Sequence, residues 1–322
     1  MPTPRTEGPV LVTGGAGAIG STLVRSLLER KRSVVVVDSL VGGHRSHLPS
    51  GDAAHGLTFV EADARDAKAY AARAEGASEI WHLAANPDIR LGTREPRVDL
   101  ENGTLAASEV LEVARRHDVP RFFFSSSSVV YGLPSVFPTP ESYGPLLPES
   151  LYGAHKLAVE GLVSAYAHSY GITAYVFRFA NIIGPRMTHG VLPDFFEKLR
   201  RDPTRLEVLG DGRQAKSYLR TEECVDAMLL VGERAHDRVN LFNLGTTDRL
   251  SVREIAERVV VACGGRARID YAGGDRGWVG DVPQQLLAID RVRSLGWTPR
   301  LTSAEAVDRT IAEMADARKC AP

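Results

Sequence analysis

The fold of this chain is decided by the stretch VLVTGGAGAIG at residues 10–20. Residues 10–13 form a short apolar run that predicts a buried strand. Residues 18–30 place apolar side chains on one face and predict a helix. The glycines between them lack a Cβ, so the backbone can turn tightly and approach a pyrophosphate at the helix N-terminus. This order predicts a dinucleotide-binding turn that includes Gly14, Gly17, Ala18, Ile19 and Gly20.

Outward from this stretch, short apolar runs alternate with longer amphipathic segments. Residues 34–37 are four valines, which favours a strand covered on both faces of a sheet. The other predicted strands are 57–60, 79–83, 121–124 and 173–179, and the other predicted helices are 97–116 and 151–169. Alternation of this kind predicts the α/β class, with a Rossmann-type doubly wound parallel sheet.

The pattern changes after about residue 180. Proline and glycine become frequent, and helical patterns recur at 192–200, 222–234, 252–261 and 303–319. We interpret residues 1–180 as a cofactor-binding Rossmann domain. Residues 181–322 are interpreted as a smaller mixed α/β substrate domain, with some segments returning to the first domain.

Composition narrows the function classes. The 322 residues are 43% apolar and 25% charged, and the net charge is −1, so a basic nucleic-acid surface is not expected. Cys224, Cys263 and Cys320 are far apart and form no metal-binding pair, which fits a reducing cytoplasm. His44 and His47 lie in a polar loop without a carboxylate partner, so no metal site is expected. The N-terminus lacks an apolar signal core and no run could span a bilayer, so a cytoplasmic protein away from membranes is expected.

Asp38 ends the second predicted strand. A carboxylate there can accept hydrogen bonds from the adenosine ribose hydroxyls and would repel a 2′-phosphate, which favours NAD over NADP. The alternative is that Asp38 only caps the following turn. Arg45 in the next loop would soften the discrimination. Asp63 follows the third strand, where it either faces the adenine or is an ordinary strand-end residue.

Tyr152 and Lys156 are four residues apart in a predicted helix and therefore share one face. A lysine ammonium beside a phenol favours the phenolate, so the tyrosine can act as a base near neutral pH. The pair alone also fits an ordinary surface helix. Together with the glycine-rich turn, it indicates redox chemistry.

Several motifs extend this pattern over most of the chain. They are TGGAGAIGS at 13–21, Asp38, HLAA at 82–85, SSSSVVYG at 125–132, YGAHK at 152–156, RFANIIGPR at 178–186 and GDGRQ at 210–214. In their order the chain resembles the extended short-chain dehydrogenase/reductase family. The segments AANPDIR at 84–90 and RGWVGD at 276–281 are similar to nucleotide-sugar 4-epimerases, such as those for UDP-galactose and UDP-glucuronate.

The resemblance implies Ser127, Tyr152 and Lys156 as the catalytic group, with Ser127 bound to the sugar O4. It also implies NAD contacts from Leu83, Ala84, Ala85 and Ser125. Dehydratases of the family need an Asp-Glu pair after the catalytic hydroxyl, whereas this chain has Ser128 and Val129. The reaction is then either C4 epimerisation through a 4-keto sugar, or one-way NAD(P)H-dependent reduction of a nucleotide 4-keto sugar. A non-catalytic NAD-sensing protein is the third alternative.

On the substrate side the resemblance implies a UDP-sugar. The residues that it assigns to this ligand are Ser127, Ser128, Asn181, Arg186, Thr188, Leu192, Lys216, Arg276 and Asp281. Arg186 is the expected cation for a uronate carboxylate, so UDP-glucuronate and UDP-glucose or UDP-galactose remain open as substrates. Lys216 and Arg220 depart from the family pattern, which usually has an arginine and an aromatic residue there. The family also implies a homodimer, in which Leu105, Leu111, Leu157 and Leu162 would form the seam or else pack on their own sheet.

Overall fold

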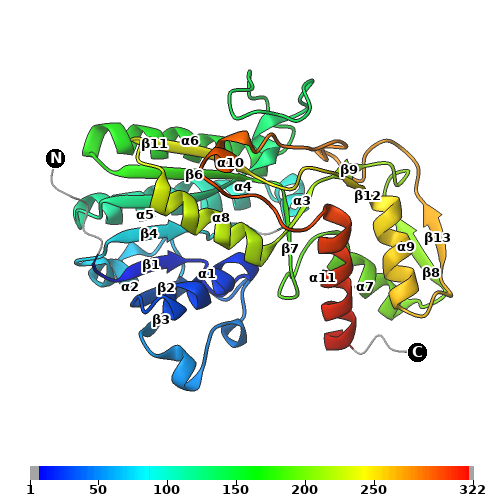
Figure 1. Ribbon diagram of the computed structural model, residues 1–322, viewed down its shortest axis with the longest axis horizontal. Coiled ribbons are helices and arrows are strands. Elements are labelled where there is room, and N and C mark those ends of the chain that lie inside the picture. Colours follow the sequence, from blue (N-terminus) through cyan, green and yellow to red (C-terminus); the bar gives the residue numbers. More distant parts are fainter. Residues whose placement is uncertain (1–6, 87, 319–322) are drawn as a thin grey trace.

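The structure is a computed structural model that describes residues 7–86 and 88–318. In this part of the chain, seven parallel strands form one large sheet in the order β11-β6-β5-β4-β1-β2-β3 (Figure 1). The strand order reverses between β1 and β4, as in a doubly wound fold, which confirms the predicted fold class. The strands are β1 Val10–Thr13, β2 Val34–Asp38, β3 Leu57–Glu61, β4 Glu79–His82, β5 Arg121–Ser127, β6 Thr173–Phe179 and β11 Val239–Leu244.

Helices cover both faces of this sheet because side chains alternate along each strand. Phe123 faces the layer of α1 (Ala18–Glu29) and α8 (Thr221–Arg234). Phe122 and Phe124 face the opposite layer, which contains α2 (Ala67–Tyr70), α5 (Ala106–Arg116) and α6 (Leu151–Tyr170). The edge strand β11 and the helix α8 come from the second half of the sequence. The predicted boundary near residue 180 stays a prediction.

The helix predicted at 97–116 is not one regular α-helix. It consists of α4 (Arg97–Asp99), the π-helical segment η4 (Leu100–Leu105) and α5. A π-helical turn has more residues per turn than an α-helix but needs no special residue types. The apolar spacing in the sequence therefore could not distinguish this segment from an α-helix. A short helix before it, α3 (Ile89–Arg94), was not predicted.

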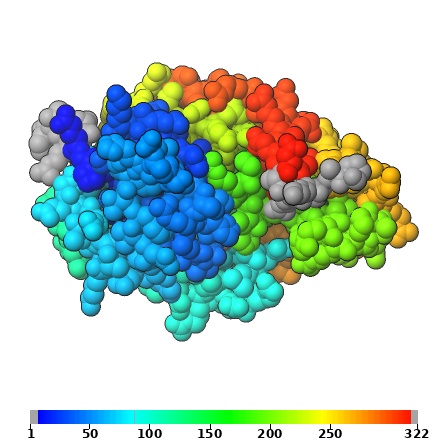
Figure 2. All heavy atoms as spheres, turned by 90° about the horizontal axis from the view of Figure 1, so that it is seen from below, coloured from blue at the N-terminus to red at the C-terminus, as the bar shows by residue number. Residues whose placement is uncertain are grey.

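A smaller lobe packs beside the large sheet, visible in the ribbon (Figure 1) and as the green and orange surface in Figure 2. It has its own apolar core, which includes Phe196, Val259 and Val307. Its helices are α7 (Val191–Arg201), α9 (Val252–Ala262) and α11 (Ser303–Arg318), close to the predicted ranges, although Lys319 and Cys320 lie outside the described residues. Its strands and those that join it to the sheet are β7 Asn181–Ile183, β8 Arg205–Val208, β9 Ala215–Lys216, β10 Tyr218–Arg220, β12 Leu250–Ser251 and β13 Arg268–Tyr271.

Within the described residues, no helix is long and apolar enough to cross a membrane, and no cluster of His, Cys, Asp and Glu could hold a metal ion. The rings of His44 and His47 do meet edge to face, with their centroids 5.0 Å apart. The His47 ring also bonds the backbone oxygen of Ala16 through its Nδ1 at 3.0 Å, beside the glycine-rich turn.

Candidate active site

A cavity of about 780 Å³ opens along the carboxyl ends of the sheet strands and extends to the smaller lobe. Ligands of doubly wound sheets bind at this edge, near the reversal of strand order. Among the sequence-predicted residues, those that line the cavity are Gly14, Gly17, Ala18, Ile19, Gly20, Asp38, Asp63, Leu83, Ala84, Ala85, Ser125, Ser127, Ser128, Tyr152, Lys156, Asn181, Thr188, Lys216 and Asp281. One continuous space therefore joins the predicted cofactor and substrate residues.

The glycine-rich turn lies between β1 and α1. Gly14 has φ of +73°, and a Cβ there would lie 2.6 Å from the backbone nitrogen of Ala84. A Cβ on Gly20 would lie 2.2 Å from the backbone oxygen of Gly14, so both positions admit only glycine without rearrangement. No side chain of the described residues caps the N-terminus of α1. Its first N–H groups are thus left for a ligand, which fits a dinucleotide pyrophosphate.

Asp38 is fixed beside this turn. Its Oδ2 accepts a hydrogen bond from the Ala16 backbone N–H at 2.8 Å, and its Oδ1 accepts one from Leu40 N–H at 2.8 Å. The carboxylate therefore caps the turn and also faces the cavity, so the two predicted roles are compatible. Each carboxylate oxygen retains a lone pair that a ribose hydroxyl can use.

Asp63 also faces the cavity, but it is bound to its own neighbour. The Arg65 guanidinium donates to it at 2.7 Å and holds the pKa of Asp63 below its usual value. Arg65 bonds Glu101 as well, at 3.0 Å. Arg45 instead lies over the ring of Phe59, 4.7 Å from its centroid.

Tyr152 and Lys156 lie in the first turns of α6. The helix begins after Ser150, whose Oγ accepts a hydrogen bond from Gly153 N–H at 3.1 Å. The buried Lys156 ammonium donates to the backbone oxygen of Ser125 at 2.6 Å and lies 5.5 Å from the centroid of the Tyr152 ring. The helix thus presents the phenol and the ammonium side by side, with the ammonium anchored to the end of β5.

The electrostatics of this pair differ from the sequence-based expectation. Burial raises the pKa of Tyr152, and the negative charge of Asp99 raises it further. Burial also lowers the pKa of Lys156 to about 8, against the opposing effect of Asp99 and Glu160. In the protein by itself, burial of the phenol therefore dominates, and the expected phenolate near neutral pH depends on the positive nicotinamide ring as well as on Lys156. A further positive charge beside Tyr152 is needed for it to act as a base near neutral pH.

The four serines of the SSSS run have different partners. Ser125 Oγ donates to the His82 backbone oxygen at 3.3 Å, and Ser126 Oγ donates to Glu160 at 2.5 Å. Ser127 Oγ accepts a long hydrogen bond from Val129 N–H at 3.4 Å, and Ser127 lines the cavity. Its hydroxyl proton has no acceptor among the described residues, so it is available to a ligand.

Three groups line the substrate end of the cavity. Lys216 Nζ donates to Asp281 Oδ1 at 2.6 Å, and Asp281 Oδ2 accepts a hydrogen bond from Gly277 N–H at 3.0 Å. Asn181 Nδ2 donates to the Ser217 backbone oxygen at 3.2 Å. Asp281 therefore neutralises the positive charge of Lys216, and a ligand at this end of the cavity would meet an ion pair rather than a free cation.

The structure places other predicted substrate residues away from the cavity. Arg186 donates to Ser21 Oγ at 3.0 Å, and thus contacts helix α1. Leu192 is fully buried in the core of the smaller lobe, although its neighbour Val191 lines the cavity. Arg276 forms an ion pair with Glu149 at 3.0 Å. The side chains of Arg186 and Arg276 thus have partners within the protein and do not line the cavity, whereas the Leu192 prediction concerned the backbone around that residue and stays a prediction.

Arg220, which departs from the family pattern, is also committed inside the smaller lobe. Its guanidinium donates to Glu313 at 2.7 and 2.9 Å and to Thr310 Oγ1 at 3.0 Å. Arg220 thus holds α11 against the start of α8, rather than facing a ligand.

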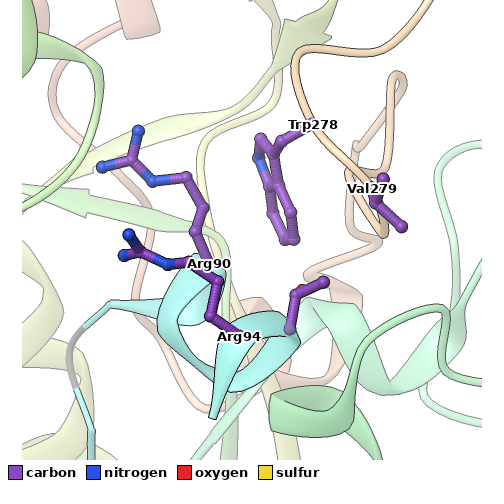
Figure 3. Close-up of a pocket in the computed structure, with 5 residues that line it drawn as sticks. Arg90, Arg94, Trp278 and Val279 are labelled. Carbon is purple, nitrogen blue, oxygen red and sulfur yellow. The ribbon is translucent and has the colours of Figure 1, made fainter.

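A second pocket of about 420 Å³ adjoins the main cavity. Figure 3 shows Arg90 and Arg94 on α3 and, opposite them, Trp278 and Val279 on a loop; Thr93 completes the lining. Arg90 and Trp278 line both spaces, so the two share a wall. Among the described residues, the ion pair of the Arg90 guanidinium is a long contact of 3.4 Å with Asp88.

Several polar residues of the main cavity were not predicted as site residues. They include Asn86, Asn102, Gln214, Tyr218 and Gln285. They come from separate parts of the sequence, so no motif or regular spacing groups them. Asn86 and Gln214 lie within the motifs at 84–90 and 210–214, and those motifs could have pointed to them.

Comparison with known proteins agrees with this geometry. The model of the NAD dependent epimerase/dehydratase family matches residues 10–245, and the chain belongs to this family. The UDP-glucose 4-epimerase of Mycolicibacterium smegmatis is 33% identical over 308 residues, covering 94% of this chain and 96% of that protein.

Solved structures lead to the same family. A UDP-galactose 4-epimerase superposes with a TM-score of 0.87 at 39% identity, covering 96% of this chain and 99% of that one. The Thermus thermophilus UDP-glucose 4-epimerase, solved with NAD, has a TM-score of 0.85 at 27% identity, covering 96% and 100% of the two chains. The predicted resemblance to nucleotide-sugar 4-epimerases and the prediction of NAD as the cofactor are confirmed.

Proposed function

We propose that this protein is an NAD-dependent epimerase that inverts C4 of a UDP-sugar. One observation carries the proposal: the Tyr152–Lys156 pair and Ser127 line the same cavity as the glycine-rich turn and the Lys216–Asp281 pair. A dinucleotide bound at the turn and a nucleotide sugar bound at the other end would meet at Tyr152.

The residues of the chain have separate tasks in this reaction. Ser127 holds the sugar O4 through its free hydroxyl, and Tyr152 removes the O4 proton. Lys156, anchored on the Ser125 carbonyl, keeps its charge beside the phenol. A bound NAD, held at the glycine-rich turn and Asp38, would supply the hydride acceptor and donor for C4 and a positive charge beside Tyr152. Between these events the 4-keto sugar turns about its link to the diphosphate, so binding must concentrate on the UDP half.

The absence of an extra acid supports epimerisation over elimination of water. Ser128 and Val129 follow Ser127 and line the cavity, where a dehydratase would need carboxylates. The two positions directly after Ser127 thus carry no carboxylate, which fits a site that oxidises and re-reduces one carbon.

For the sugar, the geometry best supports interconversion of UDP-glucose and UDP-galactose. A uronate needs a cation for its carboxylate, and Arg186 is bound to α1 instead. Named relatives and a neighbour solved with UDP-glucose support the neutral hexose. UDP-glucuronate is the second candidate, because Arg90 lines the cavity and a neighbour is solved with UDP-glucuronic acid and NAD.

The test is incubation of the purified protein, without added reduced cofactor, with UDP-glucose, UDP-N-acetylglucosamine and UDP-glucuronate in turn. Product NMR at C4 reports inversion. Accumulation of the C4 epimer of one of them supports the proposal. If turnover appears only with a 4-keto sugar and added NAD(P)H, the protein is a reductase instead. If none of these substrates reacts, the protein is better described as a non-catalytic NAD-binding protein.

A homodimer is proposed as the assembly, through the face formed by η4, α5 and α6. Leu105 is 47% exposed there and is available to a partner. Leu111 is fully buried in its own chain, and Leu157 and Leu162 pack partly against the protein core, so the predicted seam reduces mainly to Leu105. Light scattering of the purified protein checks the dimer.

A further inference from the structure

A pocket that the proposed reaction does not use lies between α3 and the loop at 276–281. It has a volume of about 420 Å³, and the residues that line it are Arg90, Thr93, Arg94, Trp278 and Val279 (Figure 3). Pockets that hold small organic ligands begin at roughly 300 Å³. The space is therefore large enough for a group of several carbon atoms, and its lining indicates the chemistry of that group.

Two arginines give this pocket a positive charge. Arg90 and Arg94 are four residues apart on α3 and therefore share one face of the helix. Figure 3 shows both guanidinium groups extending to the same side of α3. Like charges at this spacing repel each other, so the pair is destabilising unless an anion lies nearby.

The described residues supply no strong anionic partner for these two guanidinium groups. Arg94 forms no ion pair or hydrogen bond with any of them. Arg90 Nε lies 3.4 Å from Asp88 Oδ1, an oxygen that already accepts a hydrogen bond from the Arg90 backbone N–H at 3.1 Å. The two side chains thus keep most of their hydrogen-bond donors for a ligand.

The other arginine and lysine side chains that line the adjoining cavity each have a close partner. Lys156 Nζ, Lys216 Nζ and Arg65 Nη2 donate to protein oxygens at 2.6, 2.6 and 2.7 Å. Unpaired positive charge is therefore concentrated at Arg90, which lines both spaces, and at Arg94, which lines the pocket.

The opposite wall of the pocket is apolar and held in place. It consists of the indole of Trp278 and the isopropyl group of Val279. Asp281 N–H donates to the Trp278 backbone oxygen at 3.1 Å, and Arg276 pairs with Glu149 at 3.0 Å, so both ends of this loop are tied down. A preformed wall of this kind packs against hydrocarbon with little loss of loop entropy on binding.

We propose that this pocket is an accessory subsite that binds a carboxylate-bearing substituent of the UDP-sugar. The proposal rests on the proposed function, because it takes the sugar to lie in the adjoining cavity. The carboxylate would bind the guanidinium groups of Arg90 and Arg94, which match it in charge and geometry. The carbon atoms of the substituent would pack on Trp278 and Val279. A neutral hexose leaves this pocket to water, so the subsite adds acidic sugars to the neutral ones.

The experiment measures Kd by calorimetry, with the protein saturated with NADH, which cannot oxidise the sugar. Two matched pairs of ligands are compared. UDP-N-acetylmuramic acid differs from UDP-N-acetylglucosamine by a lactyl ether with a carboxylate, and UDP-glucuronate differs from UDP-glucose by a carboxylate at C6. In at least one pair the acidic ligand should bind the wild type about tenfold or more tightly, because charge-assisted hydrogen bonds are strong.

Two variants of Arg94 test whether the pocket causes this preference. In Arg94→Gln the preference should fall to less than about threefold, because one of the two cations is lost. In Arg94→Glu the neutral ligand of the same pair should bind more tightly than the acidic one, because the charge at this position is reversed.

Arg97→Gln is the matched control. It removes the same charge from the neighbouring α4, where the side chain is 84% exposed, pairs with Glu101 and lines neither space. Its preference for the acidic ligand should equal that of the wild type. This separates contact within the pocket from a general loss of positive charge.

The absence of a preference for the acidic ligand in both pairs overturns the proposal, and so does a preference that Arg94→Gln leaves unchanged. Equal weakening of acidic and neutral ligands in Arg94→Gln also overturns it, because the arginine would then bind the diphosphate that all four ligands share. Turnover of a neutral UDP-sugar without any preference leaves the proposed function without the subsite. A preference that depends on Arg94, without turnover of any ligand by the NAD-bound protein, supports the subsite and refutes the proposed function. If none of the four ligands binds, both are overturned.

Discussion

The ion pair between Arg178 of β6 and Glu160 of α6 leads to a sharp prediction about stability. The guanidinium donates to the carboxylate through Nη2 at 2.7 Å and through Nε at 3.0 Å. The side chains are 4% and 10% exposed, and the guanidinium also lies 4.7 Å from the centroid of the Tyr131 ring. This pair ties the helix that carries Tyr152 to the sheet.

The perturbation is Arg178→Met, which keeps most of the aliphatic volume but leaves Glu160 as a buried, uncompensated charge. Breaking one side of a buried pair costs about 3–5 kcal/mol. Loss of the donor bond to the Glu141 backbone oxygen, 3.2 Å long, adds about 1 kcal/mol. At roughly 2–4 °C per kcal/mol for a large domain, a total loss of about 4–6 kcal/mol should lower the melting temperature by about 8–24 °C.

Urea and thermal unfolding measure this loss, with Arg201→Met as the control. Arg201 also pairs with a glutamate, Glu197 at 2.8 Å, but its side chain is 72% exposed, so this variant should lose less than about 1 kcal/mol. The double variant Arg178→Met/Glu160→Leu should regain part of the loss, because the stranded charge is gone. A loss below about 1 kcal/mol in Arg178→Met would refute the reasoning that desolvation dominates here.

The remaining predictions concern the site. Tyr152→Phe should lose about three orders of magnitude in kcat while NAD still binds, because the proton acceptor is removed; near wild-type turnover would exclude Tyr152 as the base. The wild type should bind NAD at least about tenfold more tightly than NADP, and Asp38→Asn should narrow this ratio, since the anion that repels a 2′-phosphate is lost; a wild-type preference for NADP by fluorescence titration would contradict that role. In Arg90→Gln, kcat/KM for UDP-glucuronate should fall about tenfold or more while that for UDP-glucose changes less than about threefold, because only the uronate needs a cation. Arg97→Gln, an exposed change on the neighbouring helix, is the control, and equal losses on both substrates would show that Arg90 does not read the carboxylate.

The sequence predicted six strands of the large sheet because their signals are local, but it did not predict the edge strand β11. Runs such as the valines of β2 and the glycine-rich turn after β1 have few alternative structures. The carboxyl ends of the strands of a parallel sheet meet at one edge. The sequence could therefore predict that one cavity is lined by the glycine-rich turn, Asp38 and the Tyr152–Lys156 pair.

The parts that were missed depend on contacts between distant segments. Arg186 lies in a motif associated with ligand binding, yet it contacts Ser21 of α1, far away in the sequence. The raised pKa of Tyr152 results from burial, which no residue pattern states. The short strands β9 and β12 pair with each other across the smaller lobe, and two-residue strands have no periodicity to detect.

The route of the chain between its two lobes has a consequence for engineering. After β6 it leaves the large sheet to form β7 and α7, and then returns to add α8 and β11. It departs again to α9, packs α10 (Asp290–Ser294) back against the large sheet, and ends in α11. The smaller lobe is thus not encoded by one contiguous stretch of sequence, so a single segment exchange between relatives could not replace it. A chimaera that aims to transfer sugar preference must swap discontinuous segments on either side of β11 together, while leaving that edge strand with its parental sheet.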